Sequence, residues 1–85
     1  MGGPTVFVYI LQSDSTGRYY TGSAMDLENH INEHNCGGNK STIHGIPWRL
    51  VHVIETDTRS EANRIELKIK SRGAGRFLEH LKKPG

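Results

Sequence analysis

The sequence predicts an α+β fold in which a small three-stranded antiparallel sheet is flanked by helices. Three segments rich in β-branched and aromatic residues lie at 5–12, 18–23 and 47–55. Two other segments, at 26–35 and 59–70, repeat apolar residues at the period of a helix. With 85 residues and 34% hydrophobic content the chain can bury one core, so residues 1–85 are expected to form a single domain.

The first two strands form a predicted hairpin. The run "TVFVYILQ" is followed by the turn sequence "DSTG" and then by "RYYTGS". The first strand is apolar on both faces, which is typical of a central strand. One face is expected to carry Val6, Val8 and Ile10, and the other Phe7, Tyr9 and Leu11. Tyr9 is therefore predicted to lie among core residues.

A helix is predicted over 26–35, with Asp26 as its N-cap. Its buried stripe mixes apolar and imidazole groups, because helical spacing places together Leu27, His30, Ile31 and His34. A glycine-containing loop follows. The third strand, "PWRLVHVIE", opens with Pro47, whose missing N–H does little harm at that position.

The next helix begins with the capping-box pattern Thr58-Arg59-Ser60-Glu61. Its apolar stripe contains a carboxylate, since the positions that recur at helical spacing are Ala62, Ile65, Glu66 and Ile69. An ionised carboxylate is rarely buried alone, so Glu66 is expected to have a cation, an arginine or a metal as its partner. The sequence "SRGAG" then interrupts the pattern, and "RFLEHL" predicts a short last helix.

Positive charge is concentrated at one end of the chain. Residues 59–85 contain eight Lys and Arg against three Glu, a balance of +5, whereas residues 1–58 contain three against six acidic residues, a balance of −3. The basic segment suits nucleic acid, and a solvated helix face explains it equally well. The sequence has a single cysteine, Cys36, and no long apolar run. The protein is therefore expected in the cytoplasm and without a membrane partner.

The stretch "HINEH", residues 30–34, has the H-x-x-E-H pattern of one class of zinc protease. A protease would use His30 and His34 as ligands and Glu33 as base. Against this, Glu33 lies about 100° around the helix from His34, and the chain is short for such an enzyme. A structural zinc on His30, His34 and Cys36 is a second alternative.

Four segments together resemble the GIY-YIG endonucleases, in particular their small single-domain members. Val8-Tyr9-Ile10 and Tyr20-Thr21-Gly22 stand at the two halves of the motif that names the family. The segments "DLENHINEHN", "GIPWRLVHVIE" and "RSEANRIELKIK" are similar to the helix, strand and helix that follow it in the family. The resemblance covers nearly the whole chain.

This resemblance implies a DNA endonuclease that hydrolyses phosphodiester bonds with Mg²⁺ or Mn²⁺ bound to Glu66. Tyr9, Tyr20 and His34 are then expected to position or deprotonate the attacking water. A metal and a fixed cation stabilise the charge that accumulates on the phosphate. Candidate nucleic-acid contacts, from a loop and from the basic segment, are Lys40, Ser41, Thr42, Lys70 and Arg72. A homodimer or a partner protein stays open.

Two positions depart from the family pattern. The family arginine falls at His30, and a lysine found in some relatives falls at Ser23. Histidine lacks the forked guanidinium and is only partly charged at neutral pH. Loss of one such transition-state donor costs about 10²- to 10³-fold in rate. The sequence therefore predicts a weakened endonuclease, with a catalytically inactive nucleic-acid or protein-binding module on the same fold as the alternative.

Overall fold

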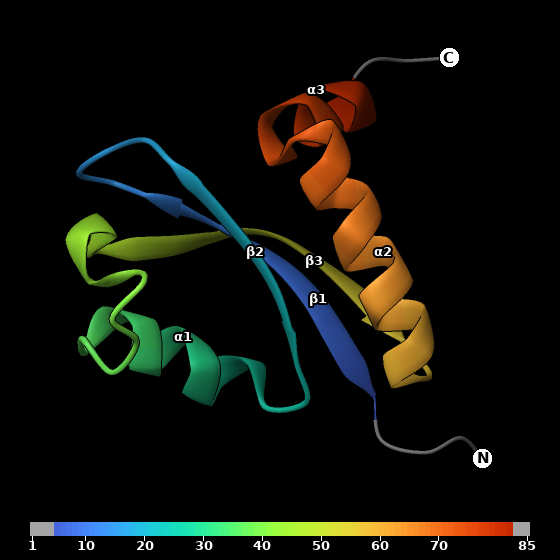
Figure 1. Ribbon diagram of the computed structural model, residues 1–85, viewed down its shortest axis with the longest axis horizontal. Coiled ribbons are helices and arrows are strands. Elements are labelled where there is room, and N and C mark those ends of the chain that lie inside the picture. The colour runs from blue at the N-terminus through green and yellow to red at the C-terminus, as the bar shows by residue number, and fades with distance from the viewer. Residues whose placement is uncertain (1–4, 83–85) are drawn as a thin grey trace.

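The computed structural model describes residues 5–82, which form one three-stranded sheet and three α-helices (Figure 1). Both strand pairs are antiparallel, and the strand order is β2-β1-β3. The predicted fold class and the central position of the first strand are confirmed. In chain order the elements are β1 Val6–Ser13, β2 Tyr19–Ala24, α1 Leu27–Asn35, the short 3₁₀ helix η1 Ile43–Gly45, β3 Trp48–Thr56, α2 Arg59–Arg72 and α3 Ala74–Lys82.

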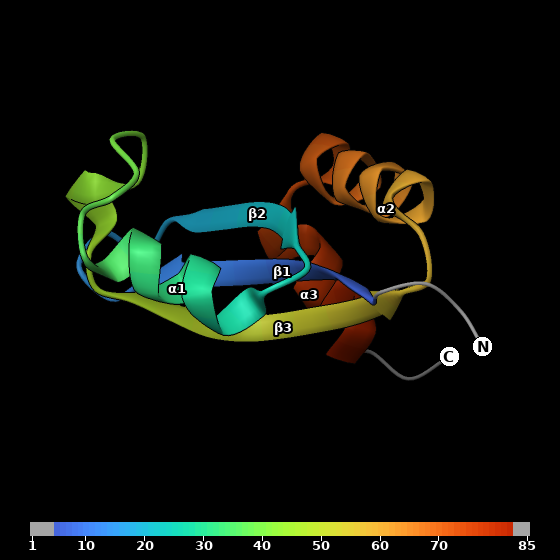
Figure 2. The same ribbon diagram turned by 90° about the horizontal axis from the view of Figure 1, so that it is seen from below.

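The sheet carries a separate core on each face, because β1 is apolar on both sides. Val8 and Ile10 pack against Ala62 and Ile69 of α2, and residues of α3 cover the same cluster. The opposite face of β1 buries Tyr9 and Leu11 with Ala24 and Trp48, under Leu27 and Ile31 of α1. Figure 2 shows α1 in front of the strands and α3 behind them. The alternation along β1 thus places α1 on one face of the sheet and both α2 and α3 on the other.

Both predicted N-caps are present. The Asp26 carboxylate accepts a hydrogen bond from the Asn29 N–H at 3.1 Å, and the Thr58 hydroxyl accepts one from the Glu61 N–H at 3.0 Å. The second half of the capping box differs from the prediction, since Glu61 accepts from the N–H of Asp57 instead of from Thr58. The two helix starts are therefore defined locally, as the sequence indicated.

The last two helices are separated by a single glycine. Gly73 has φ 98°, in the left-handed region that favours glycine, and its N–H donates to the Ile69 carbonyl. The last helix begins at Ala74, two residues before the predicted start at Arg76. Among residues 5–82, no helix has the length and apolar character needed to cross a membrane.

Candidate active site

Tyr9 reaches across the neighbouring strand, and Gly22 makes this possible. The two residues are directly opposite each other in the β1–β2 register. A Cβ atom on residue 22 would lie 2.7 Å from the Tyr9 hydroxyl oxygen and 2.9 Å from its Cζ, so any side chain there would collide with the ring. The glycine of the second motif is thus required by the tyrosine of the first.

His34 is buried beneath Tyr9 with both ring nitrogens engaged. Its Nε2 lies 3.3 Å from the Tyr9 hydroxyl, and its Nδ1 lies 2.8 Å from the hydroxyl of Thr42. The Thr42 hydroxyl donates its one proton to the Asn39 carbonyl, so the Nδ1–H of His34 donates to Thr42. The Nε2 lone pair then accepts the hydrogen bond of the phenol. This arrangement orients His34 as a proton acceptor toward Tyr9.

Tyr20 completes the aromatic group on this face. Its ring centroid lies 4.8 Å from that of His34 and 6.3 Å from those of Tyr9 and Trp48. The three residues predicted to handle the attacking water, Tyr9, Tyr20 and His34, are therefore brought together from two strands and a helix.

Burial keeps the Tyr9–His34 pair uncharged at neutral pH. It raises the pKa of Tyr9 to about 12, with further contributions from Tyr20, Glu66 and Glu33. The pKa of His34 is lowered, first by burial and then by the nearby His30, while Glu33 opposes the change. A neutral imidazole has a free lone pair at neutral pH, so His34 can accept a proton without first losing one.

Glu66 lies on α2 with a cation already bound to it. Its side chain is 19% exposed, and its Oε2 is 2.7 Å from Nζ of Lys70, one helical turn along. The prediction that this carboxylate needs a partner is confirmed, and the partner is a lysine. The negative charge of Glu66 also contributes to the raised pKa of Tyr9, after burial and Tyr20. The i,i+4 spacing was the sequence signal for Lys70 as a partner.

The donor set at Glu66 fits a hard divalent ion. Such an ion binds through one or two carboxylates and takes its other ligands from water and phosphate oxygens. Within residues 5–82, no three His, Cys, Asp or Glu side chains lie close enough together to hold a metal. The zinc alternative is therefore wrong, because His34 uses both nitrogens in hydrogen bonds and Cys36 is exposed to solvent. The protease interpretation fails for the same reason.

His30, which stands where the arginine was expected, lines a small pocket beside His34. The pocket has a volume of about 240 Å³, and Lys40 and Glu33 contribute to it together with Gly38 and Asn39. Two basic side chains from different segments thus line one pocket with His34.

The other predicted nucleic-acid contacts are dispersed. Ser41 is exposed and Thr42 is buried against His34. Lys70 is occupied by Glu66, and Arg72 lies apart, with Arg76 and His80 of α3. The assignment of these five residues to DNA contacts stays a prediction.

Sequence reasoning missed the contacts that hold the loop under the site. The Asn35 side chain donates to the Trp48 carbonyl at 2.9 Å and accepts from the Trp48 N–H, which ties the end of α1 to the start of β3. The Trp48 indole N–H donates to the Thr42 carbonyl at 2.7 Å. Thr42 is thereby fixed opposite His34. The "EHN" sequence ends a helix with an asparagine, and that was the only available signal for this connection.

The fold and the motif tyrosines next to His34 are those of a GIY-YIG type of domain. The family model for the GIY-YIG catalytic domain matches residues 5–80. The chain belongs to this nuclease family, whose members act on DNA.

Several relatives carry the name UPF0213 protein. The chain is 42% identical over 64 residues to one from Halobacterium salinarum, an alignment of 74% of this chain and 82% of the relative. It is 37% identical over 79 residues to one from Syntrophus aciditrophicus, covering 89% of this chain and 88% of the relative. The solution NMR structure of a UPF0213 protein from Bacillus halodurans superimposes with a TM-score of 0.57 at 33% identity, over 92% of this chain and 85% of that chain.

Proposed function

We propose that this protein is a metal-dependent DNA endonuclease that hydrolyses phosphodiester bonds. The observation that carries the proposal is the hydrogen-bonded, uncharged Tyr9–His34 pair within the electrostatic reach of the Glu66 carboxylate. Hydrolysis of a phosphodiester needs a proton acceptor, which His34 would supply, and positive charge on the phosphate, for which the Glu66 carboxylate would hold a metal ion.

The hydrogen bonds suggest the path of the proton. Water placed against the Tyr9 oxygen loses a proton to it, while the phenol passes its own proton to Nε2 of His34. The resulting hydroxide attacks phosphorus, the bond to the leaving oxygen breaks, and that oxygen is protonated from solvent. Thr42 holds the imidazole in the tautomer that accepts from Tyr9. Glu66 would hold Mg²⁺ or Mn²⁺, which would supply positive charge near the phosphate.

The second source of positive charge is weak in this chain. A guanidinium would be fixed and always charged, whereas the pocket beside His34 offers the imidazole of His30 and the flexible ammonium of Lys40. We therefore propose slow cleavage, with His30 and Lys40 sharing the contact to the phosphate.

Nicking of supercoiled plasmid DNA in the presence of Mg²⁺ or Mn²⁺ tests the proposal. Glu66→Gln is expected to abolish nicking, and Glu55→Gln, which removes an exposed carboxylate on β3, is the matched control and should nick normally. His30→Arg is expected to raise the rate about tenfold or more, because it restores a fixed transition-state cation. Tyr9→Phe is expected to lower the rate about 10²- to 10⁴-fold, because it removes the proton relay.

Two outcomes contradict parts of this proposal. Nicking that is undiminished in Glu66→Gln overturns the metal assignment. No nicking by either the parent or His30→Arg, combined with retained DNA binding, instead supports the non-catalytic binding module, an interpretation that the histidine at position 30 already favours.

A further inference from the structure

A hollow next to the catalytic residues has the chemistry of a nucleotide-binding subsite. It has a volume of about 520 Å³, which is within the range of small-molecule sites. It opens between the end of the β1–β2 hairpin and the segment before β3, and it is lined by Thr16, Arg18, Tyr19, Tyr20, Ser41, Thr42, His44, Gly45 and Trp48.

The hollow adjoins the proposed catalytic pair through two shared residues. Tyr20 lines it and also lies with its ring centroid 4.8 Å from that of His34. Thr42 lines it and bonds to Nδ1 of the same histidine at 2.8 Å. A group bound in the hollow is thus separated from His34 by one side chain, which is the separation expected for a nucleotide that neighbours the scissile phosphate.

The charges in the hollow favour an anion. Its ionisable side chains apart from tyrosine are Arg18 and His44, and no carboxylate is among its lining residues. The hairpin end that presents Arg18 is held in place, since Ser13 accepts from the N–H groups of Ser15 and Thr16, and the Ser13 N–H donates to the Arg18 carbonyl at 2.8 Å. These bonds hold the backbone that carries Arg18, and its exposed guanidinium suits a phosphate.

The walls also suit an aromatic ring. Tyr20 and Trp48 approach each other edge to face, with ring centroids 6.3 Å apart, and Tyr20 is only half-buried. Nucleobases stack on exposed aromatic side chains with little regard to sequence. A phosphate and a base are the two groups that this combination of arginine and tyrosine recognises.

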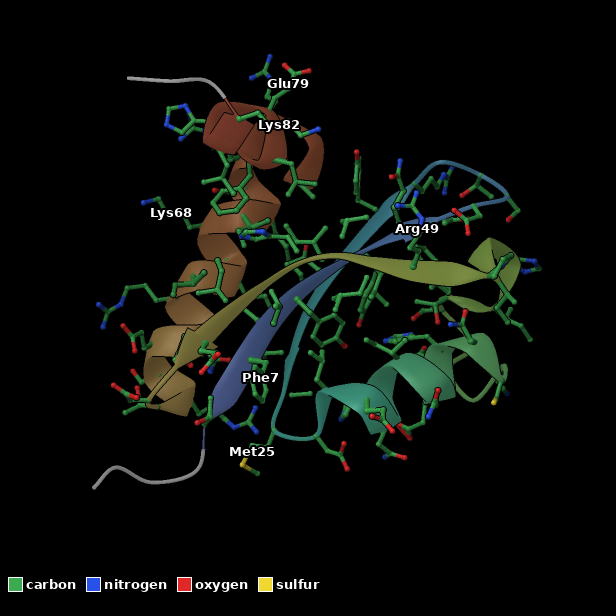
Figure 3. The ribbon with its side chains drawn as sticks, turned by 180° about the vertical axis from the view of Figure 1, so that it is seen from behind. Phe7, Met25, Arg49, Lys68, Glu79 and Lys82 are labelled. Atoms are coloured by element: carbon green, nitrogen blue, oxygen red, sulfur yellow. The ribbon has the colours of Figure 1, made fainter. Side chains whose placement is uncertain are left out.

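A second, larger hollow of about 630 Å³ is a poorer match. It lies between β3 and α3, where Figure 3 labels Arg49, Glu79 and Lys82. Arg49 is paired with Asp14 at 3.2 Å, and Glu79 adds a negative charge to the lining. This hollow also shares neither Tyr20 nor Thr42 with the catalytic group.

We propose that the hollow around Arg18 and Tyr20 binds the nucleotide next to the cut in an unpaired state. A base within a duplex is stacked between its neighbours and has to leave the helix to enter a protein pocket. The site therefore selects single-stranded DNA or DNA with unpaired nucleotides at the cleavage point. This inference rests on the proposed nuclease function and adds the substrate class.

The test is a titration of ¹⁵N-labelled protein with a four-nucleotide oligothymidylate, without divalent metal, followed by NMR. The largest amide shifts are expected at Arg18, Tyr20, Ser41, Thr42 and His44. Arg18→Gln should weaken binding about fivefold, the size of a solvent-accessible ion pair. Arg64→Gln, which removes the same charge from an exposed position on α2, should change it less than twofold. His44→Gln provides a second variant within the hollow.

Shifts centred on the cations of α3, or equal weakening by Arg18→Gln and Arg64→Gln, would overturn the inference. Cleavage is measured separately, on a duplex and on the same duplex with three unpaired nucleotides at its centre, and faster cleavage of the second is expected. Binding in the hollow without any cleavage would contradict the nuclease function and leave the subsite supported. Cleavage at equal rates on both substrates, with no shifts in the hollow, would reject the subsite alone.

Discussion

The site residues on the α1 side of the sheet are held by neutral hydrogen bonds, whereas Glu66 on α2 is held by an ion pair. On the first side, Tyr9, His34 and Thr42 are all buried and satisfy one another. On the second side, the Lys70 side chain is 50% exposed and contacts the carboxylate from one helical turn away. The candidate site therefore has a tyrosine–histidine half, whose buried hydrogen bonds are hard to replace, and a glutamate half, whose ion pair is easier to replace.

The difference follows from solvent access. Breaking a buried hydrogen bond leaves a polar group without a partner and carries the full cost of its desolvation. An ion pair that water reaches is worth about 1 kcal/mol, and the half-exposed Lys70 ammonium can be replaced at Glu66 by water or by another cation. The tyrosine–histidine half is thus held by contacts within the protein, and under the proposed function the Glu66 carboxylate would exchange Lys70 for a metal ion.

The largest effect is expected from crowding the buried Tyr9 side chain with a substitution at Gly22. Gly22→Ala places a Cβ 2.7 Å from the Tyr9 hydroxyl, and overpacking of this kind costs about 1–3 kcal/mol in free energy of unfolding. Urea denaturation measures this loss of free energy of unfolding. The cost should be smaller when Gly22→Ala is made in a Tyr9→Phe background, which removes the clashing oxygen.

Gly75→Ala is the matched control for this experiment. Its Cβ would meet Tyr19 at 3.4 Å, an ordinary contact, and alanine is favoured over glycine within α3. It should be neutral or stabilising. Equal costs for Gly22→Ala with and without the Tyr9 hydroxyl would show that the crowding does not come from this oxygen.

An intermediate effect is expected from removing the lysine that is paired with Glu66. Lys70→Met removes the cation from Glu66, so Mn²⁺ should bind about two- to fivefold more tightly, in line with the strength of an exposed ion pair. Isothermal titration calorimetry measures the affinity for Mn²⁺. Lys68→Met is the control, because Lys68 extends from the side of α2 that is turned away from the sheet (Figure 3). Identical affinities for the two variants would refute competition between Lys70 and the metal.

The smallest effect is the pH dependence that His34 gives to the free energy of unfolding. The pKa of His34 is lowered in the folded protein, so the unfolded chain binds this proton first as the pH falls. The stabilising contribution is complete above the unfolded value near 6.5 and is lost as the pH decreases below it.

The free energy of unfolding, measured by urea at pH 7 and pH 5, should therefore fall less in His34→Gln than in the parent. His44→Gln, which changes an exposed histidine, should retain the parent's dependence. The same fall in His34→Gln as in the parent would mean that another group titrates.

Much of the fold is determined by local sequence patterns. The alternation in β1, the N-caps at Asp26 and Thr58 and the glycine at position 73 each act over a few residues, and the structure places all of them within two residues of the prediction. Because a strand that is apolar on both faces needs cover on both sides, β1 also required helices on the two faces of the sheet. Glu66 was found in the same way, as a polar group on an apolar stripe, whereas the motif tyrosines were found by their resemblance to the family motif.

What the sequence determined by itself is the order of the elements and the two-sided core, because these depend on period and residue type, whereas the roles of the candidate site residues came from the resemblance to the GIY-YIG family. Only the tertiary structure decided that Gly22 makes room for Tyr9, that Thr42 orients His34 and that Arg18 and Tyr20 border one hollow. These relations join residues from different elements. Their distances depend on how the hairpin, the helices and the loop close on the sheet, which no short-range pattern encodes.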